Sequence, residues 1–138
     1  MKKIIVIDGQ GGRIGAMLVS GLINENVQAQ IIAVGTNSAA TSAMLKAGAE
    51  NGATGENPAI YVSGSADVIT GPIGIINANA LLGEITPKMS AAISESSAPK
   101  VLIPVNKCSI SIAGIQEMSM TEYVGDAIKK IKDILSVI

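Results

Sequence analysis

One segment near the start of the chain, from Ile4 to Leu22, constrains the fold more than any other part of the sequence. It reads IIVIDGQGGRIGAMLVSGL: four β-branched residues before Asp8, then a glycine-rich turn, then apolar residues at helical spacing. The pattern predicts a buried strand, a tight turn and a helix in succession. Such a turn presents backbone N–H groups and a helix N-terminus to a phosphate group. The segment therefore predicts a parallel α/β sheet that binds a nucleotide.

The spacing of the glycines departs from the strict dinucleotide fingerprint, which places glycine at the first, third and sixth positions. Counting from Gly9, the sixth position is Ile14, and glycine instead recurs at every third residue as far as Gly15. We expect Gly9 to allow the tight turn and Gly15 to let the helix approach the sheet closely. Gly11 and Gly12 would leave room for a pyrophosphate. The alternative is a structural turn that binds nothing. The candidate site residues in this segment are Asp8, Gly9, Gln10, Gly11, Gly12, Arg13, Ile14 and Gly15.

Arg13 is the only arginine in the chain and follows the glycines directly. Its guanidinium group could bind two phosphate oxygens at once. The alternative is a solvated arginine on the first helical turn. An Arg13 that faces a concave cleft would favour ligand binding, whereas an Arg13 paired with a nearby carboxylate would favour a structural role.

Strands and helices are expected to alternate along the rest of the chain, which predicts one Rossmann-like α/β domain over residues 1–138. Its mostly parallel sheet would have the order 3-2-1-4-5, an additional edge strand and helices on both faces. After the first strand, we expect strands at Ala29–Gly35, Ala59–Val62, Asp67–Thr70 and Lys100–Val105, and a short one around residues 110–113. Helices after the first are expected at Ser38–Ala47, from Pro87 to about Ser96, and from Ser119 onward.

The end of the second predicted strand, Gly35-Thr36-Asn37, lacks the acidic residue that binds ribose hydroxyls in dinucleotide folds. Thr36 and Asn37 could instead donate hydrogen bonds to a ribose or to its phosphate. Arg13 could reach a 2′-phosphate, so NADP(H) is slightly favoured over NAD(H) as the cofactor. The alternative role for Asn37 or Ser38 is to cap the following helix.

Two later segments complete the candidate site. Ligands of parallel α/β sheets bind beyond the carboxyl ends of the strands, which is where we expect the turn after the fourth strand. That turn consists of Gly71, Pro72, Ile73 and Gly74, and its apolar continuation to about Ile85 could also form a subunit interface. Glu56 and Asn57, in a predicted polar loop from Ala49 to Pro58, are further candidates to reach a ligand.

Composition excludes several classes of function. The net charge is −1 and no basic patch with interleaved aromatic residues is present, so we expect no nucleic-acid partner. No apolar run has membrane-spanning length, and Asp8 interrupts the apolar start, so we expect neither a membrane span nor a signal peptide. A single cysteine fits a cytoplasmic protein. The chain has no histidine, which excludes Ser-His-Asp and Cys-His catalysis and leaves no zinc ligand set.

Several phrases of the sequence resemble known families. GQGGRIG, residues 9–15, is similar to the cofactor loop of dihydrodipicolinate reductases, although the histidine-bearing substrate domain of those enzymes is absent. IDGQGGRIG, VGTNSAATSAMLKAGAENGATGEN, DVITGPIGII, GEITPKM and LIPVNKC together resemble a small bacterial protein family known only as a domain of unknown function. This second resemblance spans nearly the whole chain. It implies a stand-alone, soluble, Rossmann-like domain and carries no catalytic residues over.

Two functional hypotheses follow from the sequence. The first is a nucleotide- or dinucleotide-binding domain, either an enzyme or a sensor, whose substrate site would be completed by a second subunit or partner. The second is a non-catalytic interaction or regulatory module with a structural glycine turn. Both predict a homo-oligomer. No catalytic residue is assigned, and the candidate acid–base groups are Asp8, Glu56, Glu84, Lys88, Lys107, Cys108, Tyr61 and Tyr123.

Overall fold

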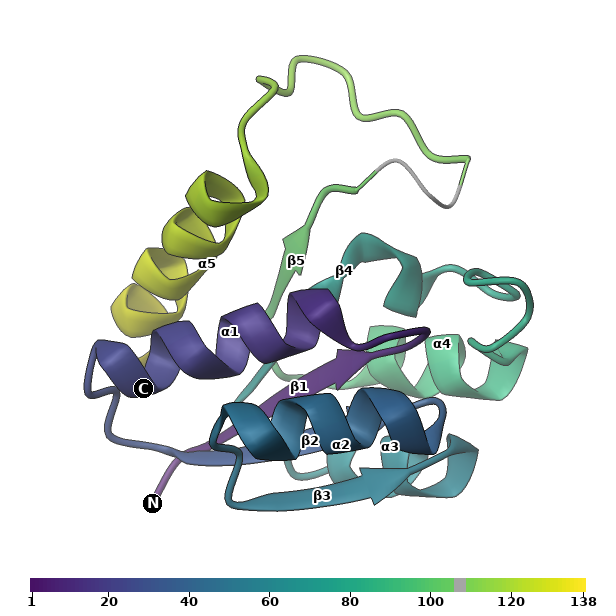
Figure 1. Ribbon diagram of the computed structural model, residues 1–138, viewed down its shortest axis with the longest axis horizontal. Helices are drawn as coiled ribbons and strands as arrows, with labels where there is room; N and C mark the ends of the chain where they lie inside the picture. Colours follow the sequence, from purple (N-terminus) through teal and green to yellow (C-terminus); the bar gives the residue numbers. More distant parts are fainter. Residues whose placement is uncertain (106–108) are drawn as a thin grey trace.

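The computed structural model describes residues 1–105 and 109–138, in which a parallel five-stranded sheet has the order β3-β2-β1-β4-β5. This confirms the order 3-2-1-4-5 predicted from the sequence. β1 occupies the centre and pairs with β2 on one side and β4 on the other (Figure 1). The strands are β1 (Lys3–Asp8), β2 (Gln30–Gly35), β3 (Asn51–Thr54), β4 (Val68–Pro72) and β5 (Lys100–Ile103).

Helices cover both faces of the sheet (Figure 1). Successive side chains of a strand point to opposite faces. Ile4 and Val6 of β1 accordingly join the core beneath α1, α2 and α5, whereas Ile5 and Ile7 join the core beneath α3 and α4. The helices are α1 (Arg13–Asn24), α2 (Ser38–Ala47), α3 (Glu56–Ser63), α4 (Pro87–Glu95) and α5 (Met120–Leu135), with a short 3₁₀ helix η1 (Ile73–Ile76).

Helix starts agree with the local capping signals. The Asn37 side chain accepts a hydrogen bond from the N–H of Ala40 at the start of α2. Thr86 caps α4, whose first residue is Pro87. Ser119 begins α5 with a complete capping box. The predicted starts of these three helices are confirmed, because a cap depends on residues only three or four positions apart.

The third strand was wrongly predicted at Ala59–Val62. The structure instead places β3 at Asn51–Thr54 and α3 at Glu56–Ser63. The sequence NGAT has little intrinsic strand preference, and it forms a strand because it pairs with Ile32–Gly35 of β2. Pro58 lies in the first turn of α3, where the missing N–H of proline costs no hydrogen bond. The predicted loop from Ala49 to Pro58 is therefore largely strand and helix.

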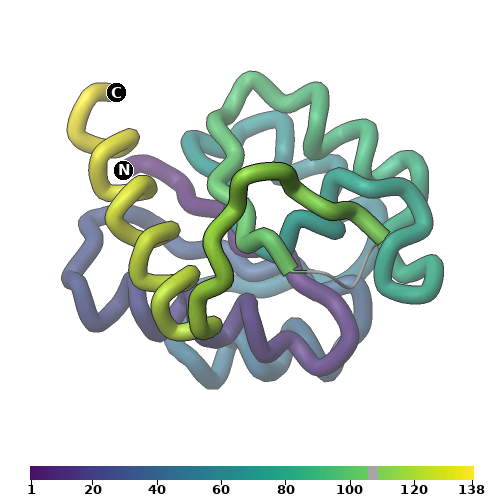
Figure 2. The backbone as a smooth tube through the Cα atoms, turned by 90° about the horizontal axis from the view of Figure 1, so that it is seen from above, coloured from purple at the N-terminus to yellow at the C-terminus, as the bar shows by residue number. Residues whose placement is uncertain are grey.

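The additional edge strand around residues 110–113 is not present, because residues 109–119 contain no strand. Ser109 and Gly114 have positive φ angles of 54° and 76°, which interrupt an extended path. The segment instead crosses above the end of the sheet between β5 and α5 (Figure 2). Within the described residues, β5 therefore keeps one unpaired edge.

The apolar stretch after β4 is mostly internal. Four of its residues are buried in the core beneath α3 and α4, where they pack with Met89 of α4: Ile75, Ala80, Leu81 and Ile85. The expected subunit interface is therefore reduced to the two large apolar side chains of this stretch that remain exposed, Ile76 and Leu82. No helix in residues 1–105 or 109–138 is long and apolar enough to cross a membrane.

Candidate functional site

The glycine loop, residues 9–15, lies at the carboxyl end of β1, where the chain leaves the centre of the sheet for α1. β1 has β2 on one side and β4 on the other, so this is the point where the strand order reverses and α/β sheets bind ligands. A cleft of about 280 Å³ opens beside the loop toward β4. It is lined by Asp8, Gly9, Gln10, Gly11, Gly12, Arg13, Ile14, Pro72, Leu81, Val105 and Met120.

Asp8 holds the glycine loop from below. The residue is 4% exposed, and its carboxylate accepts hydrogen bonds from the N–H of Gly9 (2.7 Å) and the N–H of Gly15 (2.7 Å). Desolvation raises the pKa of Asp8 above its ordinary value of 3.8, against the lowering effect of these hydrogen bonds, and the nearby charge of Glu84 raises it further. The anion-binding N–H of Gly15 is therefore already occupied by a carboxylate of the chain itself.

Gly11 and Gly12 have different surroundings. Gly12 is buried with a φ of 72°, and a Cβ atom there would lie 2.7 Å from Cα of Ala40 in α2. Gly11 is exposed, with no other atom within 4 Å of the position that a Cβ would take. Within the described residues, the N–H groups of Gly11 and Arg13 donate no hydrogen bond. Gly12 therefore serves packing, whereas Gly11 presents open backbone.

Glu84 holds the glycine loop from the side. It lies in the connection between η1 and α4, and its Oε1 atom accepts a hydrogen bond from the N–H of Gln10 (2.8 Å). The same atom accepts from the side-chain amide of Asn37 (3.0 Å) and from the hydroxyl of Thr36. Asn37 also donates to the backbone oxygen of Gln10 (2.9 Å). One carboxylate thus links the loop to the end of β2.

The hydrogen bonds to Glu84 also set its charge. Partial desolvation pulls its pKa upward, but the donors Thr36, Gln10 and Asn37 together hold the pKa below the ordinary value of 4.5. Glu84 is therefore ionised at neutral pH. The side-chain donors of Thr36 and Asn37, expected to face a ribose, are already directed at this carboxylate.

The role of Glu84 was missed from the sequence, where it was only a candidate acid–base group. It lies 48 residues from Thr36 along the chain, so no local pattern connects the two. The one available signal is that Glu84 is the only charged residue between Val68 and Pro87. A single charge in an apolar stretch needs a polar partner or solvent.

Arg13 is exposed at the first position of α1 and lines the glycine-loop cleft. It also lines a groove between α1 and α5, together with Thr121 and Val124. Within the described residues it forms no ion pair. Arg13 therefore borders both the glycine-loop cleft and the groove between α1 and α5, and its expected contact with a 2′-phosphate at the end of β2 stays a prediction.

Gly71 and Pro72 were expected in the turn after the fourth strand but are the last two residues of β4, and Pro72 contributes one wall of the cleft. Gly71 is buried, and a Cβ atom there would come within 2.1 Å of the backbone oxygen of Ile7, so its role is the close approach of β4 to β1. Ile73 and Gly74 begin η1 and are not among the residues that line the cleft.

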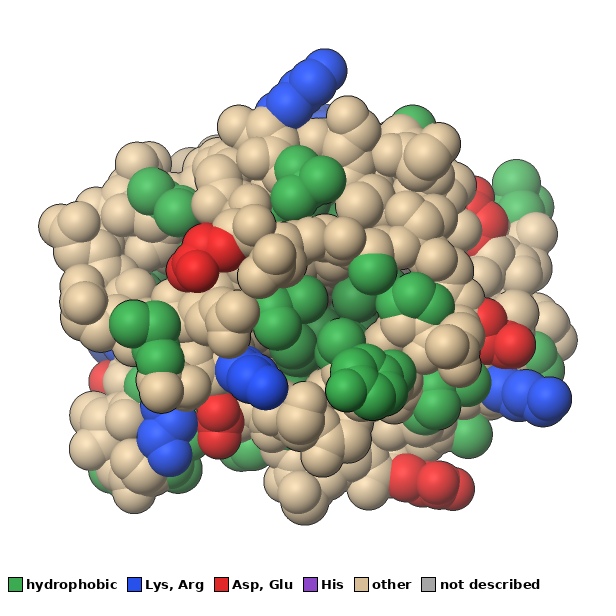
Figure 3. Space-filling view, turned by 90° about the horizontal axis from the view of Figure 1, so that it is seen from below, with side chains coloured by type: hydrophobic (Ala, Val, Ile, Leu, Met, Phe, Trp, Pro, Cys, Tyr) green, Lys and Arg blue, Asp and Glu red, His purple; other side chains and the backbone are tan. Residues whose placement is uncertain are grey.

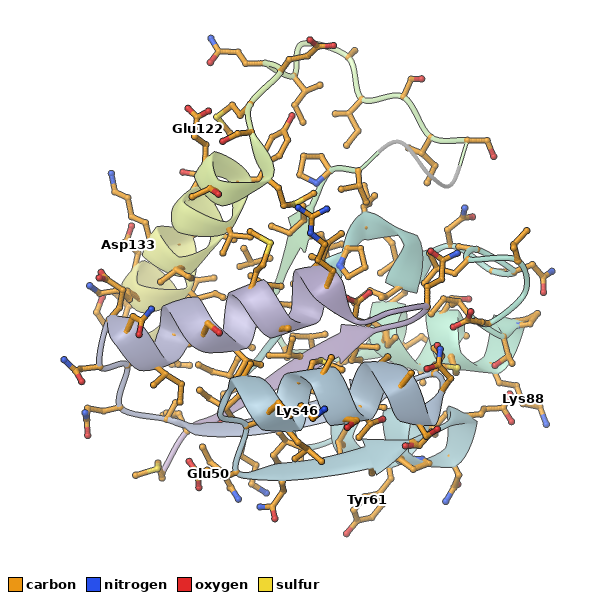
Figure 4. The ribbon with its side chains drawn as sticks, in the orientation of Figure 1. Lys46, Glu50, Tyr61, Lys88, Glu122 and Asp133 are labelled. Atoms are coloured by element: carbon orange, nitrogen blue, oxygen red, sulfur yellow. The ribbon has the colours of Figure 1, made fainter. Side chains whose placement is uncertain are left out.

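The remaining acid–base candidates that the structure describes do not converge on the loop. Tyr61 and Lys88 point outward from α3 and α4 (Figure 4). The Glu56 carboxylate accepts a hydrogen bond from Thr86 (2.6 Å), and the Tyr123 hydroxyl donates to the backbone oxygen of Gln116 (2.9 Å). Asn57 lies in the first turn of α3. Lys107 and Cys108 lie outside the described residues.

Comparisons with known proteins agree with the resemblance noted in the sequence. No curated protein sequence matches this chain. Among solved structures, the chain is similar to the crystal structure of a dodecameric FMN-dependent Ubix-like decarboxylase from Escherichia coli O157:H7. That similarity has a TM-score of 0.48 and 14% sequence identity, and it covers 99% of this chain and 94% of the other. Residues 3–136 match the model of one family, and the chain belongs to that family, Domain of unknown function (DUF3842).

Proposed function

We propose that this protein binds a nucleotide whose phosphate lies against the glycine loop at the start of α1. Two observations on the described residues together carry the proposal. The N–H groups of Gly11 and Arg13 are open, and the Arg13 side chain has no carboxylate partner there. All of these groups border the same cleft. A helix N-terminus and a guanidinium group both favour a phosphate.

The size and walls of the cleft indicate which part of a nucleotide it would hold. Its volume of about 280 Å³ is at the lower end of ligand sites, which span roughly 300–1,000 Å³. The cleft has apolar walls, which are provided by Pro72, Leu81, Val105 and Met120. The cleft therefore suits a phosphate and one adjoining flat ring, while the rest of a larger ligand would extend over the loop.

Asp8 limits the affinity that we expect. Its carboxylate already accepts from Gly15 and lies close to where a phosphate would sit, so like charges oppose each other there. The attraction must come from Arg13 and the open N–H groups. We therefore expect binding that depends strongly on Arg13 and weakens as salt screens the charges.

A larger hollow of about 720 Å³ lies between the open edge of β5 and α5. Its walls combine apolar side chains such as Ile115 and Met118 with solvated charges such as Lys130. No glycine-loop residue borders it. The glycine-loop cleft is preferred because polar groups suited to one ligand converge there.

The test is a thermal-shift series with NAD(H), NADP(H), ATP and FMN on the wild-type protein, Arg13→Ala and Lys88→Ala. Lys88 is the control because its side chain points outward from α4, away from the loop (Figure 4). We expect at least one phosphate-bearing ligand to raise the melting temperature of the wild type and of Lys88→Ala, and not of Arg13→Ala. An unchanged melting temperature with every ligand would exclude the proposal and favour the interaction-module hypothesis.

A further inference from the structure

We infer that Glu84 selects a ligand whose ribose carries a free 2′-hydroxyl and rejects one with a 2′-phosphate. This inference rests on the proposed function, because it assumes a nucleotide that crosses the glycine loop from the β4 side to the end of β2. It assigns to that ligand a class, an NAD-type dinucleotide, and it reverses the preference for NADP(H) that the sequence suggested.

The position of Glu84 supplies the carboxylate that the end of β2 lacks. In dinucleotide folds, an acidic residue at the end of the second strand accepts hydrogen bonds from the ribose hydroxyls. Here the chain at that point is Gly35-Thr36-Asn37, without an acid. The Glu84 carboxylate reaches the same place from the connection before α4 and is held there by Thr36, Asn37 and Gln10. A distant segment thus completes the polar surroundings of β2.

The two carboxylate oxygens of Glu84 differ in their hydrogen bonds. Oε1 accepts all three hydrogen bonds from the chain, whereas Oε2 accepts none within residues 1–105 and 109–138. A carboxylate oxygen has room for further donors, and a ribose hydroxyl is a donor of suitable geometry. The three donors to Oε1 hold the carboxylate in place, so Oε2 is preorganised to bind without further ordering.

Local charge opposes a phosphate at the same place. Glu84 is half-exposed and ionised, and Asp8 lies close enough for their charges to interact. Arg13, the one arginine, lines the groove between α1 and α5 together with Thr121 and Val124. A 2′-phosphate would therefore meet negative charge, and like charges placed together weaken binding.

The Glu84→Gln variant separates this role from the structural one. A glutamine side chain keeps an oxygen that accepts from Gln10, Thr36 and Asn37, so the loop stays linked to β2, while the negative charge is lost. The matched control is Glu50→Gln, because Glu50 is exposed between α2 and β3, far from the loop (Figure 4).

The experiment is calorimetric titration of NAD⁺, NADP⁺ and AMP into the wild-type protein, Glu84→Gln and Glu50→Gln. We expect the wild type and Glu50→Gln to bind NAD⁺ at least about tenfold more tightly than NADP⁺, and Glu84→Gln to lose most of that ratio. Equal affinities for NAD⁺ and NADP⁺, or a ratio unchanged in Glu84→Gln, would overturn the inference. Binding of AMP without NAD⁺ would overturn it too, yet leave the proposed function standing. Only the failure of every nucleotide to bind would remove both.

Discussion

At the scale of single residues, two carboxylates determine the geometry of the glycine loop. Asp8 accepts from the backbone of Gly9 and Gly15 underneath the loop, and Glu84 accepts from Gln10 at its side. Their pKa values shift in opposite directions, because Asp8 is deeply buried whereas Glu84 is half-exposed with three donors. The loop is therefore held by two different carboxylates. Burial disfavours the charged form of Asp8, whereas three hydrogen-bond donors stabilise the charged form of Glu84.

The buried charge of Asp8 predicts a pH-dependent stability. Because its pKa in the folded protein lies above the ordinary 3.8, the folded state retains the proton longer than the unfolded chain does. The contribution of Asp8 is therefore most favourable below pH 4 and declines as the pH rises through the raised value. We expect the stability of the wild type relative to Asp8→Asn to fall between pH 4 and pH 7. Urea denaturation at several pH values measures this difference, and a constant difference would contradict the prediction.

At the scale of secondary-structure elements, α5 packs over the edge strand β5 of the sheet. Its residues Val124, Ile128 and Ile131 are buried in the core beneath α1, α2 and α5, next to α1 and β5. The helix starts with a capping box, in which the Ser119 hydroxyl accepts from the N–H of Glu122 (3.2 Å) and the Glu122 carboxylate accepts from the N–H of Ser119 (3.1 Å). This cap sets where α5 begins beyond the irregular segment 109–119.

The cap predicts the effect of a single substitution. Ser119→Ala removes the acceptor for the first turn and should lower the free energy of unfolding by about 1 kcal/mol. The melting temperature should then fall by roughly 4 °C. Ser136→Ala is the matched control at the other end of α5, where the hydroxyl donates only to the backbone oxygen of Asp133. Calorimetry of both variants measures the two melting temperatures. An equal decrease in both variants would show that the Ser119 cap has no special role in stability.

At the scale of the whole molecule, apolar surface remains on two sides. Figure 3 shows hydrophobic side chains gathered on the face seen from below, the side on which Tyr61 of α3 projects in Figure 4. On the connection before α4, Leu82 is 97% exposed, and both Leu81 and Leu82 have a φ of 57°. Left-handed backbone at adjacent leucines is costly, and such strain clusters at functional contacts.

These features support the prediction of a homo-oligomer. We expect light scattering at micromolar concentration to give a mass above the 14.0 kDa of one chain. Leu82→Asp should shift the mass toward the monomer, because burial of one leucine contributes about 1.5–3 kcal/mol per subunit. Val137→Asp is the control, since this residue is also exposed but lies at the C-terminal end. A monomeric wild type would refute the prediction.

Much of the fold was predictable because its signals are local. Patterns within a few residues predict the turn after β1 and the starts of α2, α4 and α5. The handedness of parallel crossovers then predicts the order of the sheet. A cleft lies beside the glycine loop, and ligand binding there stays a prediction. The error at Ala59–Val62 has another origin, because Asn51–Thr54 forms a strand only through its pairing with β2. The error at residues 110–113 reflects the positive φ angles of Ser109 and Gly114, which alternation of apolar residues does not reveal.

The sequence by itself determined a central strand, a glycine turn and a helix that open a cleft at the middle of a parallel sheet. Only the tertiary structure decided how that cleft is charged. It buried Asp8 beneath the loop, turned Arg13 toward α5 and brought Glu84 to the end of β2. The physical reason is that a turn or cap depends on neighbours in the chain, whereas the surroundings of a carboxylate depend on segments that meet only after folding.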